Sequence, residues 1–335
     1  MSTSPYSPPL QALRIIATGV ALPPGKVESS ALDHKLGKTA GYVEQRSGIK
    51  YRFHASENAS QAELAAAALH DALERHAIDS LSIDLLISAS AVAYQALPCT
   101  AIHILKAARL APGTAGFDIN SSCVSFISAL QVASGLLNTG SYKRIAIVSA
   151  DIASRGIDWE HEESSLIFGD GAACAIVERG DGSSRILGSL VEMYPSGSEL
   201  CEIRAGGTRC NPRAGMEDAD FLFHMQGKKL FRHASSIIEG YFQRLLDQSK
   251  LTLSDIATVV PHQASHLSLE HMRKRLHVSN DVLIDIYRHH GNQVSASIPS
   301  ALHEAMITGR FNAGEPVMLI GTAAGLTLAG MIILP

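Results

Sequence analysis

Cys123 is the first residue of this chain whose type and setting point to chemistry. It lies in the segment 118–126, where an apolar strand is expected to end and an apolar helix to begin. A thiol at the start of a helix faces unpaired backbone N–H groups and the positive end of the helix dipole, which favour the nucleophilic thiolate. A nucleophile on such a turn indicates acyl transfer, whereas most free cysteines are buried apolar residues.

His262 and Asn292 occupy comparable positions farther along the chain. His262 follows a second apolar segment and is flanked by Pro261 and Gln263, and Asn292 follows a third apolar segment and Gly291. In open α/β architectures, sites form beyond the carboxyl ends of strands. We therefore expect Cys123, His262 and Asn292 to belong to one site.

The composition is that of a globular α/β protein with a large core. The chain has 335 residues, of which 46% are hydrophobic and 18% charged, and its formal net charge is −4. This charge gives no basic footprint for nucleic acid or for an anionic membrane. No apolar run reaches the roughly 18 residues of a spanning helix, and residues 1–10 do not have the pattern of a secretory signal.

Five cysteines are present, and none of them forms a Cys-x-x-Cys pair. An odd number without a secretory signal predicts reduced thiols in the cytoplasm. Cys201 and Cys210 could be considered as metal ligands, but we interpret them as two unrelated loop cysteines. We therefore expect no metal site.

Strand-like and helix-like segments alternate along the chain, which predicts a layered α/β fold with buried strands. The apolar tail 317–335 is interpreted as a strand, a turn and a strand. The other expected strands are 14–20, 83–89, 116–120, 144–150, 172–178, 185–194, 258–260, 282–286 and 316–320, and the expected helices are 60–76, 101–110, 123–138, 228–248 and 266–276.

Two stretches of the chain resemble each other. Each has an apolar-Asp-Ile triplet, a polar candidate residue, a Ser-Ala-Leu triplet in a helix, a Thr-Gly pair and a strand. We interpret this as a duplication that places Cys123 and Asn292 at equivalent strand ends. The first stretch contains 117–119, 128–130 and 139–140, and the second contains 284–286, 300–302 and 308–309.

Six segments in this order resemble the β-ketoacyl-acyl-carrier-protein synthase III family of thiolase-like condensing enzymes, over nearly the whole chain. No single segment is strongly specific, but together they are. The chain is identified as a specialised member of this family. The segments are 42–52 with its Arg-Ser-Gly-Ile core, the nucleophile segment 118–126, Phe-Gly-Asp-Gly-Ala-Ala at 168–173, Pro-His-Gln-Ala at 261–264, His-Gly-Asn at 290–292 with 295–299, and the glycine-rich 321–327.

The resemblance implies a five-layered αβαβα thiolase-like fold in two similar halves. We expect an N-terminal half, 1–180, to carry the nucleophile, and a C-terminal half, 181–335, to carry the histidine and the asparagine. It also implies a homodimer, acyl-CoA or acyl carrier protein as partners, and catalysis without a metal or redox cofactor.

The resemblance also implies a role for each candidate residue. Cys123 becomes acylated by an acyl thioester, and His262 and Asn292 stabilise the enolate formed when a malonyl group loses CO₂. The backbone N–H groups of Cys123 and Ala324 are the candidates for the oxyanion hole of the acyl-enzyme. Implied substrate-binding positions are Tyr42, Arg46, Leu97 and Phe231. Leu97 matches a position that reaches across the dimer to close the acyl pocket, although a plain core leucine is an alternative.

The chain departs from the family where housekeeping members hold the adenine of CoA. Tyr42 stands in place of a tryptophan, and Glu162 falls near the position of an arginine. Ser265 and Leu267 stand where the family has an asparagine and an arginine. An acidic side chain cannot hold the adenine by a cation–π contact and repels the phosphates of CoA. These departures predict weak CoA binding or a carrier-bound substrate, and an unusual or longer acyl primer in secondary metabolism.

The leading hypothesis is a decarboxylative condensing enzyme. One alternative is an acyltransferase that passes the cysteine-bound acyl group to an alcohol or amine. Another alternative is a non-catalytic partner subunit of a heterodimeric synthase. The retention of Asn292 favours condensation, and the intact Cys123 and His262 argue against a non-catalytic subunit.

Overall fold

Two five-stranded sheets form the frame of the protein in the computed structural model, which describes residues 11–335. Residues 1–10, for which the sequence predicts no secretory signal, lie outside the described residues. The first sheet has the order β2 (Arg14–Ala21), β8 (Gly171–Glu178), β7 (Arg144–Asp151), β5 (Leu85–Ser88) and β6 (Ala115–Asp118). The second has the order β1 (Gln11–Ala12), β9 (Arg185–Met193), β14 (Thr327–Leu334), β13 (Val317–Ala323) and β12 (Thr258–Pro261).

The two sheets repeat the same sequence of strand directions. In the first, β2–β8 and β8–β7 are antiparallel, and β7–β5 and β5–β6 are parallel. In the second, β9–β14 and β14–β13 are antiparallel, and β13–β12 is parallel. The two similar halves expected from the sequence are therefore present. β1 pairs with β9 of the second sheet, and the boundary between residues 180 and 181 stays a prediction.

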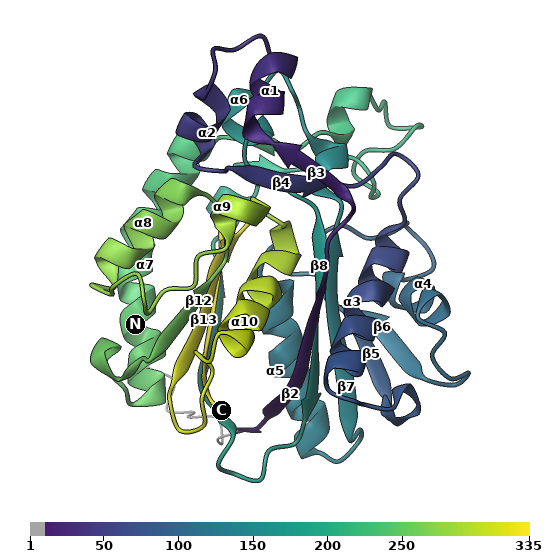
Figure 1. Cartoon of the computed structure of the whole chain (residues 1–335), viewed down its shortest axis with the longest axis vertical. Coiled ribbons are helices and arrows are strands. Elements are labelled where there is room, and N and C mark those ends of the chain that lie inside the picture. Colours follow the sequence, from purple (N-terminus) through teal and green to yellow (C-terminus); the bar gives the residue numbers. More distant parts are fainter. Residues whose placement is uncertain (1–10) are drawn as a thin grey trace.

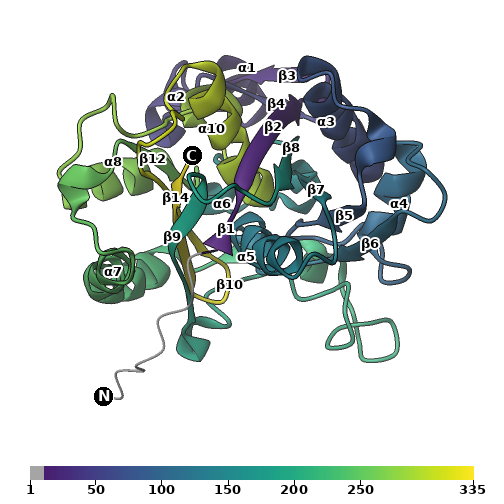
Figure 2. The same ribbon diagram turned by 90° about the horizontal axis from the view of Figure 1, so that it is seen from below.

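Helices lie between the two sheets and on both outer faces (Figures 1 and 2), and the five-layered αβαβα fold is confirmed. The buried residues of α5 and α10 pack against both sheets, and α3 and α4 cover the outer face of the first sheet. α7 packs on the outer face of the second sheet, with Leu276 and Met272 at the end of α8. The bounds are α3 (Gln61–Arg75), α4 (Thr100–Ala107), α5 (Ser125–Asn138), α7 (Gly227–Ser249), α8 (His266–Arg275) and α10 (Ser297–Ile307).

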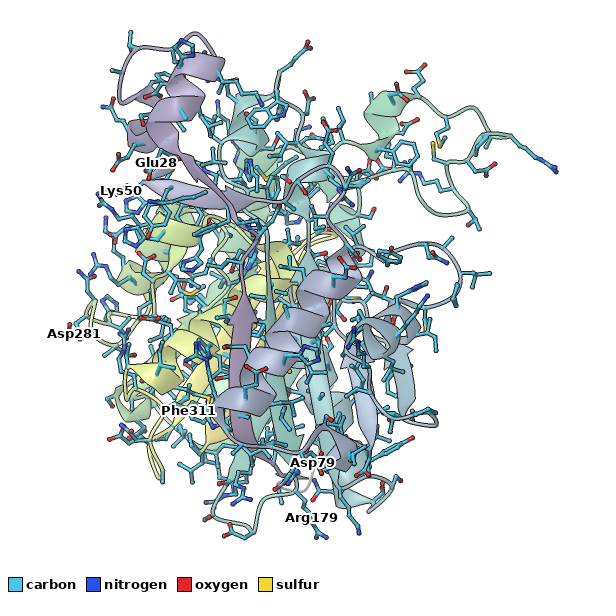
Figure 3. All side chains as sticks on the ribbon, turned by 45° about the vertical axis from the view of Figure 1, so that its right-hand side comes forward. Glu28, Lys50, Asp79, Arg179, Asp281 and Phe311 are labelled. Carbon is cyan, nitrogen blue, oxygen red and sulfur yellow. The ribbon has the colours of Figure 1, made fainter. Side chains whose placement is uncertain are left out.

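A cap of short elements closes one end of the layers (Figure 1). Figure 3 places Glu28 and Lys50 at this end, with Asp79 and Arg179 at the opposite end. The fully buried Arg52 ties the cap together, because it donates to the carbonyl of Leu166 and to the hydroxyl of Ser29. The cap contains β3 (Gly25–Glu28), β4 (Tyr51–His54), α1 (Ser29–Lys35), α2 (Tyr42–Ser47), α6 (Glu162–Ser165) and α9 (Tyr287–His290), and an excursion between β9 and α7 contains β10 (Cys201–Glu202) and β11 (His224–Met225).

The strand predicted at 282–286 is wrong. The segment makes a single bridge to the second sheet, between Val259 and Leu283. The side chain of Gln263 then takes the place of the next backbone partners: its Nε2 donates to the carbonyl of Ile284, at 3.1 Å, and its Oε1 accepts from the N–H of Ile286, at 3.0 Å. A side-chain amide thus satisfies the backbone groups that a longer strand would have paired.

The helices of residues 11–335 do not include one that is both long and apolar enough to cross a membrane. α7, with 23 residues, is the longest helix within this range, and it carries several lysine, arginine and glutamate side chains.

Gly19 sets how closely α3 packs on the first sheet, and its replacement by alanine tests this contact. A Cβ atom there would lie 2.3 Å from the backbone N of Ala72 and 2.5 Å from the carbonyl O of Ala68. Because backbone cannot move aside as a side chain can, we expect Gly19→Ala to lower the free energy of unfolding by about 1–3 kcal/mol.

Urea unfolding measures this effect, and Gly135→Ala is the matched control. Gly135 lies inside α5, and a Cβ atom added there would meet nothing within 4 Å. Alanine at this position should stabilise the helix by about 0.5–1 kcal/mol. A Gly19→Ala protein as stable as the wild type would contradict the close approach.

Candidate active site

Cys123 stands on a tight turn between β6 and α5. Ser122, just before it, has a φ of +54°, a conformation that non-glycine residues seldom adopt. The turn is held by the N–H of Ser122, which donates to Oδ1 of Asn120 at 2.9 Å. Helix α5 begins at Ser125, two residues later than the sequence predicts. Cys123 is partly exposed as a residue, but its thiol is enclosed.

The sequence predicts that Cys123 is a thiolate, but its surroundings in the structure favour the neutral thiol. Burial, together with the negative charge of Asp151, raises the pKa of the thiol to about 12, while the backbone N–H groups of Ala324 and of Cys123 itself act in the opposite direction. Desolvation therefore outweighs the helix terminus, and the resting group is a thiol. The two N–H groups lie beside the sulfur, and an oxyanion hole would need donors near the carbonyl oxygen of an acyl group bound to that sulfur.

His262 follows the end of β12 and is buried, with only 4% of its surface exposed. Its backbone N–H donates to the carbonyl of Ile320 at 2.7 Å. Burial lowers the pKa of the imidazole to about 4, so the ring is neutral near pH 7. Within residues 11–335 its Nδ1 has no hydrogen-bond partner, so no protein contact at this nitrogen sets the tautomer.

His262 and the nucleophile turn converge on Gly321 of β13. A Cβ atom at Gly321 would lie 2.9 Å from Cβ of His262 and 3.0 Å from Cγ1 of Val124, the residue after Cys123. Glycine is therefore required there, because any side chain would push the histidine and the nucleophile turn apart.

The backbone of Asn292 is held by hydrogen bonds between two segments of the chain, 167–171 and 290–293. Its N–H donates to the carbonyl of Ile167 at 2.8 Å, and its carbonyl accepts from the N–H of Gly169 at 3.0 Å. A Cβ atom at Gly169 would lie 2.0 Å from the carbonyl O of His290. Gly291 has a φ of +68°, so both glycines are needed for the contact.

The side chain of Asn292 reaches the histidine segment. Its Nδ2 donates to the carbonyl of Ala264 at 3.3 Å, and its Oδ1 accepts from the N–H of Val294 at 2.9 Å. The N–H of Ala264 in turn donates to the carbonyl of His262 at 3.0 Å. The segments of Cys123, His262, Asn292 and Ala324 are thus contiguous, as the sequence leads us to expect.

Two of the predicted substrate-binding residues lie on α2. The hydroxyl of Tyr42 donates to Glu162 at 2.8 Å. Glu162 also forms an ion pair with Lys38, whose ammonium group lies 5.0 Å from the centroid of the Tyr42 ring. These contacts lower the pKa of Glu162. The tyrosine therefore has a carboxylate beside its hydroxyl. Arg46 is exposed on the same helix.

The other two predicted substrate-binding residues are on the surface of this chain. Leu97 is 84% exposed, which contradicts the alternative that it is a core leucine. Phe231 of α7 is 48% exposed and contacts the ring of His271, with 5.0 Å between centroids. Within residues 11–335, Tyr42, Arg46, Leu97 and Phe231 make no hydrogen bond to Cys123, His262 or Asn292.

Two glutamines that support the site were not found from the sequence. Gln263 organises the segment after β12, as described above. Gln293 is 1% exposed and donates through Nε2 to the carbonyl of Asp170 at 3.2 Å. Each follows a predicted catalytic residue directly, His262 or Asn292. A glutamine directly after a candidate catalytic residue, near an apolar segment, occurs twice in the sequence, and this repetition is the signal that could have identified both.

The raised pKa of Cys123 predicts how its alkylation depends on pH. Below the pKa of a thiol, each pH unit increases the thiolate fraction about tenfold. We expect the rate of Cys123 carbamidomethylation by iodoacetamide to keep rising up to pH 10, measured by peptide mass spectrometry. A cysteine-containing model peptide, with a pKa of about 8.5, should level off. A plateau for Cys123 below pH 9 would contradict an enclosed thiol.

Comparison with known proteins identifies relatives of the whole chain. Residues 117–195 match the family model "3-Oxoacyl-[acyl-carrier-protein (ACP)] synthase III", and residues 246–334 match its C-terminal model. A crystal structure of 3-oxoacyl-[acyl-carrier-protein] synthase III from Aquifex aeolicus superposes with a TM-score of 0.86 at 27% identity, over 96% of this chain and 100% of that one.

Curated relatives match over almost their whole length. The β-ketoacyl-[acyl-carrier-protein] synthase III of Caldanaerobacter subterraneus is 31% identical over 325 residues, covering 96% of this chain and 97% of the relative. That of Syntrophomonas wolfei is 29% identical over 322 residues, covering 96% of this chain and 97% of the relative. Because the motifs, the fold and these matches agree over the full chain, it belongs to the β-ketoacyl-acyl-carrier-protein synthase III family.

Proposed function

We propose that this protein is a β-ketoacyl synthase III-type condensing enzyme, an acyltransferase of fatty acid biosynthesis. It transfers an acyl group to Cys123 and condenses it with a malonyl thioester to give a 3-ketoacyl thioester and CO₂. One observation carries the proposal: an enclosed thiol beside two backbone N–H groups is contiguous with a buried neutral histidine and an asparagine amide. Metal or redox chemistry is not needed for this reaction.

In the first step, the sulfur of Cys123 attacks the carbonyl carbon of an acyl thioester. A new C–S bond forms, the C–S bond to CoA or to the carrier's thiol breaks, and the thiol proton leaves with the departing sulfur. The oxyanion of the tetrahedral intermediate receives hydrogen bonds from the N–H groups of Cys123 and Ala324. The neutral His262, whose segment meets the nucleophile turn at Gly321, is the candidate to accept the proton during attack.

In the second step, the carbonyl oxygen of a malonyl thioester is bound by His262 and Asn292. The bond to the malonyl carboxylate breaks, CO₂ leaves, and the electron pair remains as an enolate whose oxygen both side chains stabilise. The enolate carbon attacks the acyl-Cys123 carbonyl, a C–C bond forms and the C–S bond breaks. Cys123 leaves as a thiolate and takes up one proton from water, which the overall reaction consumes. A neutral imidazole N–H suits this role, because burial opposes an imidazolium.

The acyl donor is proposed to be bound to a carrier protein rather than to CoA. The support is local: the hydroxyl of Tyr42 donates to the carboxylate of Glu162, which also occupies the ammonium group of Lys38 beside the ring. This carboxylate opposes the binding of the phosphates of CoA there. Such a preference makes the protein a specialised member of its family.

The proposed assembly is a homodimer in the cytoplasm, with the predicted halves 1–180 and 181–335. Exposed apolar residues in one segment support the dimer: Val92, Tyr94 and Leu97 are 51%, 41% and 84% exposed. Large apolar side chains exposed so close together in the chain favour an interface. The five free cysteines agree with a reducing compartment.

The proposed reaction predicts two separable activities. After incubation with acyl-carrier proteins and acyl-CoAs, intact-protein mass spectrometry should detect an acyl adduct on the wild type and none on Cys123→Ala. Cys210→Ser is the matched control, because Cys210 lies in the excursion between β9 and α7 and should leave the adduct unchanged. Asn292→Ala should still be acylated but should release CO₂ from a malonyl thioester about 10²–10³ times more slowly.

The same assay separates the alternatives. An acyl adduct without CO₂ release, together with transfer to an added alcohol or amine, would establish an acyltransferase instead. Neither an adduct nor CO₂ release with any donor would establish a non-catalytic subunit and contradict the proposal.

The charge of Glu162 predicts a change in donor preference. Glu162→Gln removes the charge and keeps the size of the side chain, so we expect the KM for acyl-CoA to fall about two- to fivefold, as for a partly exposed charge. The KM for the acyl-carrier protein should not fall with it. Glu160→Gln, two residues away and exposed, is the matched control. Equal KM values for acyl-CoA in wild type and Glu162→Gln would contradict the proposed donor.

A further inference from the structure

Asp151 is a buried carboxylate that the mechanism above does not use. It is the last residue of β7 and is 1% exposed. Its Oδ1 accepts from the N–H of Val92 at 3.0 Å, and its Oδ2 accepts from the N–H groups of Ala91, at 3.2 Å, and Ser295, at 3.1 Å. The hydroxyl of Ser295 also donates to Oδ2. All four bonds are donated to the carboxylate, which therefore needs its negative charge.

One side of Asp151 leads to the nucleophile turn. The carbonyl of Ala91 accepts from Nδ2 of Asn120 at 2.8 Å, and Oδ1 of the same asparagine holds the N–H of Ser122. Ser122 is the residue with positive φ just before Cys123. The carboxylate is thus connected to the turn of the nucleophile through one backbone segment and one side chain.

The other side of Asp151 leads to Asn292. Ser295 follows Val294, a β-branched residue with a φ of +53°, a conformation that costs free energy and persists only when surrounding contacts impose it. The N–H of Val294 donates to Oδ1 of Asn292. The hydrogen bonds from Ser295 to Asp151 hold this turn closed, and the turn orients the Asn292 amide.

We propose that Asp151 is a positioning residue: it joins the segment of Asn292 to the segment of Cys123 and sets how the asparagine amide is aimed. This inference rests on the proposed function, since enolate stabilisation is what a misaimed Asn292 would lose. Asp151 does not touch the reacting atoms. Ser295, next to the turn that orients Asn292, bonds to Asp151 directly, whereas the Cys123 turn is reached only through Ala91 and Asn120. Loss of Asp151 therefore changes the second step of the reaction more than the first.

The charge of Asp151 also affects a quantity that can be measured separately, the pKa of the Cys123 thiol. Cys123 is the titratable group on which the charge acts, and the charge adds to burial in raising the pKa of the thiol. Burial also raises the pKa of Asp151 itself, to about 6, against the opposing effect of its four donors. The groups that contact Asp151, namely Ser295, Val92 and Ala91, carry no charge of their own.

Two variants test the proposal. Asp151→Asn keeps the shape, but its amide has one acceptor oxygen, so its NH₂ group faces N–H donors. Ser295→Ala removes only the hydroxyl bond. With acyl-Cys123 formed in advance, we expect the rate of CO₂ release from a malonyl thioester to fall about 10- to 100-fold in Asp151→Asn. In Ser295→Ala it should fall about two- to tenfold, as for the loss of one hydrogen bond. The rate of Cys123 acylation should change less in both variants.

The alkylation profile of Cys123 adds a readout that a purely structural role would not move. Removal of the negative charge lowers the pKa of the thiol, so above about pH 6, where Asp151 is charged, Asp151→Asn should react with iodoacetamide faster than wild type, whereas Ser295→Ala should not. Asp33→Asn is a control, since Asp33 is 4% exposed and accepts from the N–H groups of Gly41 and Val43, both at 2.7 Å. It should lower the melting temperature without moving the alkylation profile.

Two results would overturn the proposal. One is a folded Asp151→Asn protein that releases CO₂ from a malonyl thioester at the wild-type rate. The other is wild-type CO₂ release in Ser295→Ala, a variant that decides the matter even if Asp151→Asn does not fold. Failure of the proposed function looks different: the wild type itself would then neither form acyl-Cys123 nor release CO₂, while the alkylation profiles would still compare Asp151 with its controls.

Discussion

The site depends on a backbone contact between two segments, 167–171 and 290–293, that lie far apart in the chain. The carbonyl of His290 and the side chain of Gln293 occupy the space that side chains at Gly169 and Gly171 would take, since a Cβ at either glycine would lie 2.0 Å from them. Without this space, the two hydrogen bonds that hold the backbone of Asn292 could not form. The glycines are therefore needed for close approach rather than for flexibility.

Burial then determines the protonation state of the groups that this contact brings together. It moves the pKa of Cys123 up to about 12 and that of His262 down to about 4, and both changes favour the neutral form near pH 7. The reacting thiol and imidazole themselves therefore carry no charge before substrate arrives. Charge develops during the reaction, next to N–H donors that are already in place, which is the condition for electrostatic stabilisation of a transition state.

The sequence predicts most of this frame, because long apolar segments with regular spacing form buried strands and helices. It predicts the contiguity of Cys123 and His262 for the same reason, since both follow buried strands. Asn292 follows the apolar segment 282–286 and is held at the site by its backbone bonds to Ile167 and Gly169. It fails at 282–286, where the side chain of Gln263 replaces the partners of a strand that periodicity alone predicts. It also misses Asp151, because a residue that ends an apolar strand gives no sign of which N–H groups it will meet.

Strain near the site follows a pattern that no single motif predicts. Among the non-glycine residues with positive φ in 11–335, Ser122 precedes Cys123, Val294 follows Asn292 by two residues, and Leu326 lies two residues after Ala324. Each turn aims one component: the thiol, the asparagine amide or an oxyanion N–H. Such conformations persist only when neighbouring contacts over-determine them. The precision of the site therefore comes from hydrogen bonds that hold the turns, such as those to Asn120 and Asp151, and only secondarily from contacts between the reacting side chains.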